Sequence, residues 1–114
     1  MNSPITTHVL DVAAGHPAAG IDVVLEAKTK DGFAAIGSGT TDDDGRIADL
    51  LPPEHELGPG VYRLTFHVGP YLKTTETAGF YDAIPIQFRV DAPSEHYHVP
   101  LLLSPYGYST YRGS

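Results

Sequence analysis

In this 114-residue sequence, the residues whose type and spacing most clearly suggest a chemical role are two histidines that lie two positions apart. His96 and His98 flank Tyr97 in a segment rich in β-branched and aromatic residues, so on a strand both imidazoles would point to one side. Imidazole titrates near neutral pH and suits general acid–base catalysis. The same pair, with His8 as a third ligand, would also suit a transition metal. The spacing alone leaves both interpretations open.

His8 and Arg46 are two further candidates, each with an ordinary structural alternative. A single histidine on a strand is usually a surface residue or a satisfied core residue, and Arg46 would otherwise be an exposed cation beside three aspartates. A planar guanidinium with five donors nevertheless suits an anionic or carbonyl-rich heterocycle. The acidic run 42–44 lacks the spaced ligands and terminal glutamate of a calcium loop, so it indicates a turn.

Alternating apolar and polar residues predict the strands that must position these side chains. Residues 5–11 alternate, which places His8 on the face opposite Ile5 and Val9. One face can then pack the core while the other lines a pocket. Turn residues separate the remaining predicted strands. We expect those strands at 21–28, 33–41, 46–50, 61–68, 84–90, 96–103 and 107–111, a loop at 13–20, and one short helix at 71–78.

About eight short strands with one small helix predict an all-β antiparallel sandwich. The length predicts a single domain spanning residues 1–114. A formal net charge of -7 and the lack of a basic patch argue against nucleic-acid binding. The longest apolar run, near 99–103, is too short to cross a membrane, and no secretory signal is evident, so a cytoplasmic location is expected. The sequence contains no cysteine, which leaves no thiol chemistry.

Four short motifs, distributed over nearly the whole chain, carry a resemblance to a known family. They are Thr7-His8-Val9-Leu10-Asp11, Gly15-His16-Pro17-Ala18, Asp44-Gly45-Arg46 and Tyr111-Arg112-Gly113-Ser114. With these motifs the sequence closely resembles the transthyretin-related 5-hydroxyisourate hydrolases, which are enzymes of urate breakdown. The resemblance implies the transthyretin-like fold, whose strand order and single helix match the pattern predicted above.

The resemblance also implies the roles of particular residues. It assigns His8, Arg46 and His98 to catalysis without a required metal or cofactor, and it leaves His96 less important. The substrate-binding set it implies is the terminal motif, namely Tyr111, Arg112, Gly113 and Ser114. In the family this segment lines the active-site cavity at a subunit boundary.

The implied reaction is hydrolysis of 5-hydroxyisourate to 2-oxo-4-hydroxy-4-carboxy-5-ureidoimidazoline in purine catabolism. We expect His98 to activate water, Arg46 to offset oxyanion charge, and His8 to orient water or transfer the proton. The implied assembly is a homotetramer, a dimer of dimers, and the implied partner is the small-molecule substrate. The alternative is a noncatalytic carrier of the transthyretin type, because fold does not fix function. The carrier lacks the histidines, the arginine and the terminal motif. An adhesion or assembly domain would leave that set unexplained.

Overall fold

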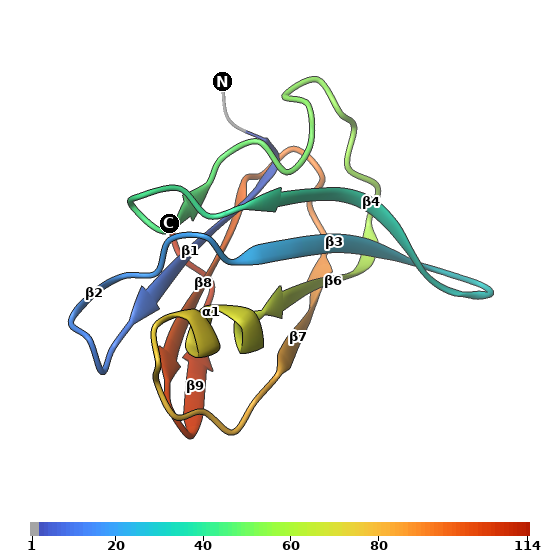
Figure 1. Ribbon diagram of the computed structural model, residues 1–114. Helices are drawn as coiled ribbons and strands as arrows, with labels where there is room; N and C mark the ends of the chain where they lie inside the picture. Colours follow the sequence, from blue (N-terminus) through green and yellow to red (C-terminus); the bar gives the residue numbers. More distant parts are fainter. Residues whose placement is uncertain (1–2) are drawn as a thin grey trace.

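The computed structural model describes residues 3–114, whose strands pair into two sheets (Figure 1). The first two residues of the predicted domain, Met1 and Asn2, lie outside the described residues. The strands are β1 (Ile5–Asp11), β2 (His16–Pro17), β3 (Asp22–Thr29), β4 (Gly32–Thr40), β5 (Arg46–Ile47), β6 (Gly60–His67), β7 (Ala83–Val90), β8 (Tyr97–Ser104) and β9 (Gly107–Thr110), and the helix is α1 (Val68–Thr74).

The two sheets have different strand orders. In the first, which we call the site sheet, the order is β2-β1-β8-β9, and β5 also pairs with β1. In the second sheet the order is β4-β3-β6-β7. Strands β1 and β8 run parallel, whereas the other pairs are antiparallel. The predicted all-β sandwich is therefore confirmed, with one parallel pair at the centre of the site sheet.

The hydrophobic core lies between the sheets and accounts for which side chains remain outside. On β1, the side chains of Ile5 and Val9 are fully buried, whereas His8 on the alternate positions is half-buried. Strand β8 shows the same alternation, with Val99 and Leu101 in the core and His98 half-buried on the other face. The outward face of the site sheet thus carries both predicted catalytic histidines.

The helix is displaced from its predicted position. It begins at Val68 instead of residue 71 and ends at Thr74 instead of residue 78. Pro70 can lie in its first turn because the amide groups there have no partner within the helix. The end is set by Thr75, whose hydroxyl donates to the Tyr71 carbonyl at 2.9 Å. With seven residues, α1 is the longest helix within residues 3–114, and none there is long and apolar enough to cross a membrane.

Two other segments also differ from the predictions. The predicted strand at 46–50 stops at Ile47, and the predicted loop at 13–20 contains the two-residue strand β2. Both strands pair with β1: β2 at Leu10 and Asp11, and β5 at Thr7 and His8. Their extents follow from pairing with a distant strand, which local alternation does not encode.

Candidate active site

The register of three neighbouring strands brings the predicted catalytic residues together. In the pairing of β1 with β5, His8 lies opposite Arg46, and in the pairing of β1 with β8, Thr6 lies opposite His98. Residues that are directly paired project their side chains from the same face of a sheet. His8, Arg46 and His98 therefore share the outward face of the site sheet, although they are far apart in the sequence.

A polar cavity of about 170 Å³ opens on this face. Its lining includes two of the predicted catalytic residues, Arg46 and His98, and also Ser114. The C-terminal segment reaches this position beside β1, as Figure 1 shows. His8 lies next to the cavity, paired with Arg46. The lining side chains are Thr6, Thr7, Arg46, Ile47, Ala48, His96, His98 and Ser114.

His98 occupies an environment that favours its neutral form. Burial lowers the pKa of the imidazole below its ordinary 6.5, and the positive charges of Arg46, His8 and His96 lower it further. Its Nδ1 lies 2.8 Å from the Thr6 hydroxyl oxygen, which leaves Nε2 as the nitrogen without that contact. A neutral imidazole with one available nitrogen is suited to accept a proton near neutral pH.

His8 has its tautomer set by the backbone. Its Nε2 lies 2.8 Å from the carbonyl oxygen of Asp44. A carbonyl oxygen can only accept, so Nε2 carries the proton and donates. In the neutral ring, Nδ1 then holds the lone pair that can accept a proton or a hydrogen bond.

The acidic turn positions both His8 and Arg46. The Asp42 carboxylate accepts hydrogen bonds from the amides of Asp44 and Arg46, each at 2.9 Å. Gly45 has a φ of +75°, and a Cβ there would meet the Val9 carbonyl of β1. The turn can therefore lie directly against β1, which presents the Asp44 carbonyl to His8. The sequence correctly indicated a turn, but it did not reveal that Asp42 braces two site residues.

The terminal motif divides into two parts, and the part at the cavity consists of its last two residues, Gly113 and Ser114. The Gly113 amide donates to the His98 carbonyl at 2.8 Å, forming an isolated bridge to β8. A Cβ on Gly113 would lie 2.6 Å from Cδ2 of the His98 ring, so only glycine fits without displacement. Together with Ser114 in the lining, this places two of the four predicted substrate-binding residues at the candidate site.

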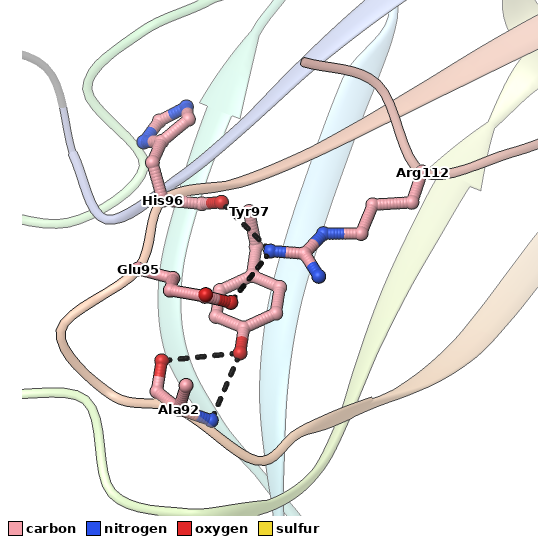
Figure 2. A network of polar contacts seen from close by, with 5 residues as sticks. All are labelled: Ala92, Glu95, His96, Tyr97 and Arg112. Carbon is pink, nitrogen blue, oxygen red and sulfur yellow. Dashed lines mark hydrogen bonds and ion pairs between the residues drawn. The ribbon is translucent and has the colours of Figure 1, made fainter.

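The other two residues of the motif, Tyr111 and Arg112, lie away from this cavity. Figure 2 shows the Arg112 guanidinium over the Tyr97 ring, 4.3 Å from its centroid, and paired with Glu95 at 3.1 Å. Arg112 also donates to the His96 carbonyl at 3.3 Å, while the His96 imidazole points away from it. Tyr111 and Arg112 line a separate cavity of about 270 Å³ with residues of β7 and β8. Within one chain they are not brought to His98.

The Thr6 hydroxyl is hydrogen-bonded to one ring nitrogen of His96 and to one ring nitrogen of His98. The Thr6 oxygen lies 2.9 Å from His96 Nε2 and 2.8 Å from His98 Nδ1. A metal chelated by these two atoms would have to displace Thr6. Within residues 3–114, no group of three or more histidine, cysteine, aspartate or glutamate side chains is arranged to hold a metal.

Thr6 is a site residue that the sequence reasoning did not select. Alternation had placed it on the same face as His8, and that was the available signal. Threonine is common in strands because its branched side chain packs well there, so its presence in β1 does not by itself indicate a function.

Comparisons with known proteins agree with the fold and with the family resemblance. A family model described as "Transthyretin: HIUase/Transthyretin family" matches residues 5–113. A 5-hydroxyisourate hydrolase of Salmonella dublin is 48% identical over 113 residues, covering 99% of this chain and 82% of the relative. The solved 5-hydroxyisourate hydrolase of Klebsiella pneumoniae is 32% identical, with a TM-score of 0.83 and coverage of 96% and 98%. Sea bream transthyretin in complex with thyroxine is also 32% identical, with a TM-score of 0.88 and coverage of 96% and 94%.

Proposed function

Because the chain belongs to the HIUase/transthyretin family, we propose that it is a hydrolase of 5-hydroxyisourate in urate degradation. The product is 2-oxo-4-hydroxy-4-carboxy-5-ureidoimidazoline. The observation that carries the proposal is the register that gathers His8, Arg46 and His98 on one face, in a chain 48% identical to a named hydrolase. The domain is proposed to span residues 1–114.

His98 is the proposed general base. Its pKa is held below the ordinary value, so at neutral pH the ring is uncharged and its Nε2 can take a proton from water. The water oxygen then forms a bond to the ring carbonyl carbon of the substrate, and the carbonyl oxygen becomes an oxyanion. The carbon–nitrogen bond breaks as that oxyanion collapses, and the leaving nitrogen takes up a proton.

Arg46 and His8 serve the two charge changes of this reaction. The guanidinium of Arg46 lines the cavity, where its donors can offset the developing oxyanion charge. His8 donates from Nε2 to a fixed carbonyl, so its Nδ1 is the nitrogen that can orient the water or handle the leaving-group proton. No redox or group-carrying step is needed to hydrolyse an activated cyclic amide.

The tail is proposed to bind the substrate. Ser114 lines the cavity and can offer its hydroxyl, while Gly113 permits close approach to the His98 ring. Arg112 is held by its ion pair with Glu95 and its contact with the Tyr97 ring, and this would fix the chain just before Gly113 and Ser114. For Tyr111 and Arg112, direct contact with the substrate is proposed to involve a second copy of the chain, because one copy places them in a separate cavity.

The assembly is proposed to be a homotetramer that works in the cytoplasm. Strands β7 and β9 are the outermost strands of their sheets, and unpaired edges favour association with another chain. Two aromatic side chains near them are strongly exposed, Phe80 at 74% and Tyr106 at 72%. Closed symmetric pairing would cover these features and would also shield the open polar cavity.

The direct test is to generate 5-hydroxyisourate with urate oxidase and to follow its spectral decay with and without the protein. We expect the parent to accelerate decay, and His98→Ala and His8→Ala each to lower turnover about 10²–10⁴-fold while circular dichroism is unchanged. A folded parent that gives no acceleration but binds thyroxine would favour the carrier alternative. A His98→Ala rate above about half the parental rate would contradict the assignment of the base.

A further inference from the structure

The Thr6 hydroxyl occupies an unusual position between two imidazoles. Thr6 is 5% exposed, and its oxygen lies 2.8 Å from His98 Nδ1 and 2.9 Å from His96 Nε2. Both histidines line the cavity, but His98 is half-buried whereas His96 is exposed to solvent. One side chain therefore links the proposed base to a second titratable group at the surface.

The two hydrogen bonds of the Thr6 hydroxyl can be arranged in two ways, which differ in the direction of donation. A hydroxyl has one proton to donate, so it cannot donate to both rings. In one state, His98 Nδ1 donates to Thr6 and Thr6 donates to His96 Nε2, which leaves a lone pair on His98 Nε2. In the other state both bonds reverse, and His98 Nε2 carries a proton instead. In the first state His98 Nε2 can accept a proton from a group in the cavity, and in the second state it can donate one.

We propose that Thr6 relays a proton between His98 and His96, so that His98 can act first as base and then as acid during one turnover. The inference rests on the proposed hydrolase function and assigns positioning roles to Thr6 and His96. Neither residue has to contact the substrate. His96, to which the family resemblance gives less importance, becomes the site where the proton is held.

The relay conserves protons over one turnover. Water gives a proton to His98 Nε2 while its oxygen bonds to the ring carbonyl carbon. The Nδ1 proton of His98 moves to the Thr6 oxygen, and the Thr6 proton moves to His96 Nε2, leaving His98 neutral and His96 as an imidazolium. When the carbon–nitrogen bond breaks, the leaving nitrogen takes the proton from His98 Nε2, and the two relay protons return.

The surroundings of His98 act against holding an excess proton on its ring. Arg46 from β5 and His8 from β1 face His98, and both act against a positive charge on its ring. The Arg112 guanidinium contacts only the backbone carbonyl of His96 and is paired with the Glu95 carboxylate, while the His96 imidazole points away from it. His96 is exposed and His98 is half-buried, so solvent can stabilise a positive charge on His96 more than on His98.

The kinetic test compares Thr6→Val, which removes only the hydroxyl, with Thr6→Ser, which keeps it. We expect Thr6→Val to lower kcat about 10- to 100-fold with little change in KM, and Thr6→Ser to stay within about threefold of the parent. His96→Ala should lose kcat similarly and regain part of it when imidazole is added to the buffer. The control Thr40→Val removes a surface hydroxyl that bonds Asp22 on the second sheet, and its kcat should equal that of the parent.

A second measurement does not depend on activity. Nitrogen-15 chemical shifts of the imidazoles report which ring nitrogen is protonated. We expect His98 to be protonated mainly at Nδ1 in the parent and Thr6→Ser, and to shift toward Nε2 in Thr6→Val. A parental kcat or an unchanged His98 tautomer in Thr6→Val would overturn the relay. A parent that shows the tautomer response but does not hydrolyse 5-hydroxyisourate would instead contradict the proposed function.

Discussion

The chemistry of single residues at this site depends on which nitrogen of each imidazole carries a proton. For His8 the Asp44 carbonyl decides, because a carbonyl accepts and Nε2 must donate. For His98 the Thr6 hydroxyl contacts Nδ1. The residue types could be selected from the sequence, since histidine and arginine suit this chemistry. The protonated nitrogens could not, because the groups that contact these rings are 36 and 92 residues away in the chain.

The pH dependence of activity should reflect the lowered pKa of His98. Burial and the neighbouring positive charges disfavour the imidazolium, so the ring stays a base at pH values where an ordinary histidine is already protonated. We expect the acid limb of kcat/KM to have its midpoint below pH 6.5, with activity falling as the pH decreases. Initial rates of 5-hydroxyisourate decay, measured across pH 4.5–8, would check this. A midpoint above the ordinary histidine value would contradict it.

The same shift predicts a change in stability with a definite sign. The folded pKa of His98 lies below its ordinary 6.5, so the unfolded chain takes up a proton first as the pH falls. The contribution of His98 to the free energy of unfolding should be fully present above pH 6.5. It should be lost as the pH falls through the folded pKa. Urea unfolding of the parent and of His98→Gln at several pH values should show this loss in the parent only.

Among the elements, β1 is the one whose role was best predicted. Its alternation correctly placed His8 opposite the core, and the turn at 42–45 was also recognised. What the sequence did not predict was long-range: the pairing that creates β2 and limits β5 to two residues, and the position of Tyr111 and Arg112 away from His98. Local propensity cannot supply such information, since each depends on packing against distant strands.

The turn before β5 offers a test of how an element positions side chains. Asp42→Ala removes the acceptor of two amide hydrogen bonds, and we expect the free energy of unfolding to fall by about 1–2 kcal/mol. Turnover should fall by about tenfold or more, because the Asp44 carbonyl and Arg46 would lose their fixed positions. Chemical denaturation and initial rates would measure both. The control is Asp43→Ala, whose carboxylate makes no hydrogen bond within residues 3–114, and equal losses in both variants would contradict the bracing role.

The bridge between the tail and β8 offers a second test. In Gly113→Ala the new Cβ would lie 2.6 Å from His98 Cδ2, so the ring or the tail must move. We expect turnover to fall by about tenfold or more, and stability to fall by about 1–3 kcal/mol, as for overpacking in a close contact. Gly107→Ala is the matched control, because a Cβ there meets nothing within 4 Å. If kinetics and thermal unfolding show Gly113→Ala behaving like Gly107→Ala, the close contact has no functional role.

At the scale of the whole molecule, one copy of the chain leaves conspicuous surface uncovered. The rings of Phe80 and Tyr81 pack edge to face with their centroids 5.1 Å apart, and the rings of Tyr81 and Tyr108 of β9 do so with their centroids 5.2 Å apart. The Phe80 amide also donates to the Pro105 carbonyl at 2.8 Å, which fixes this loop against the turn between β8 and β9. The three side chains form an exposed aromatic patch beside β9, the outermost strand of the site sheet. Exposed aromatic surface of this kind is typical of a protein interface.

The proposed tetramer can be tested by placing a charge in this patch. Phe80→Asp should reduce the particle from roughly four protomers to a smaller species, because an aspartate is costly to bury in an aromatic contact. Activity should fall with assembly, since the polar cavity on the site sheet would lose its cover and any contribution of Tyr111 or Arg112 from a second copy. Size-exclusion chromatography with light scattering, together with initial rates, would measure both effects. Lys30→Glu, in the exposed β3–β4 turn, also adds negative charge but should remain assembled and active. A parent that is fully active as a monomer would show that each chain holds a complete site by itself.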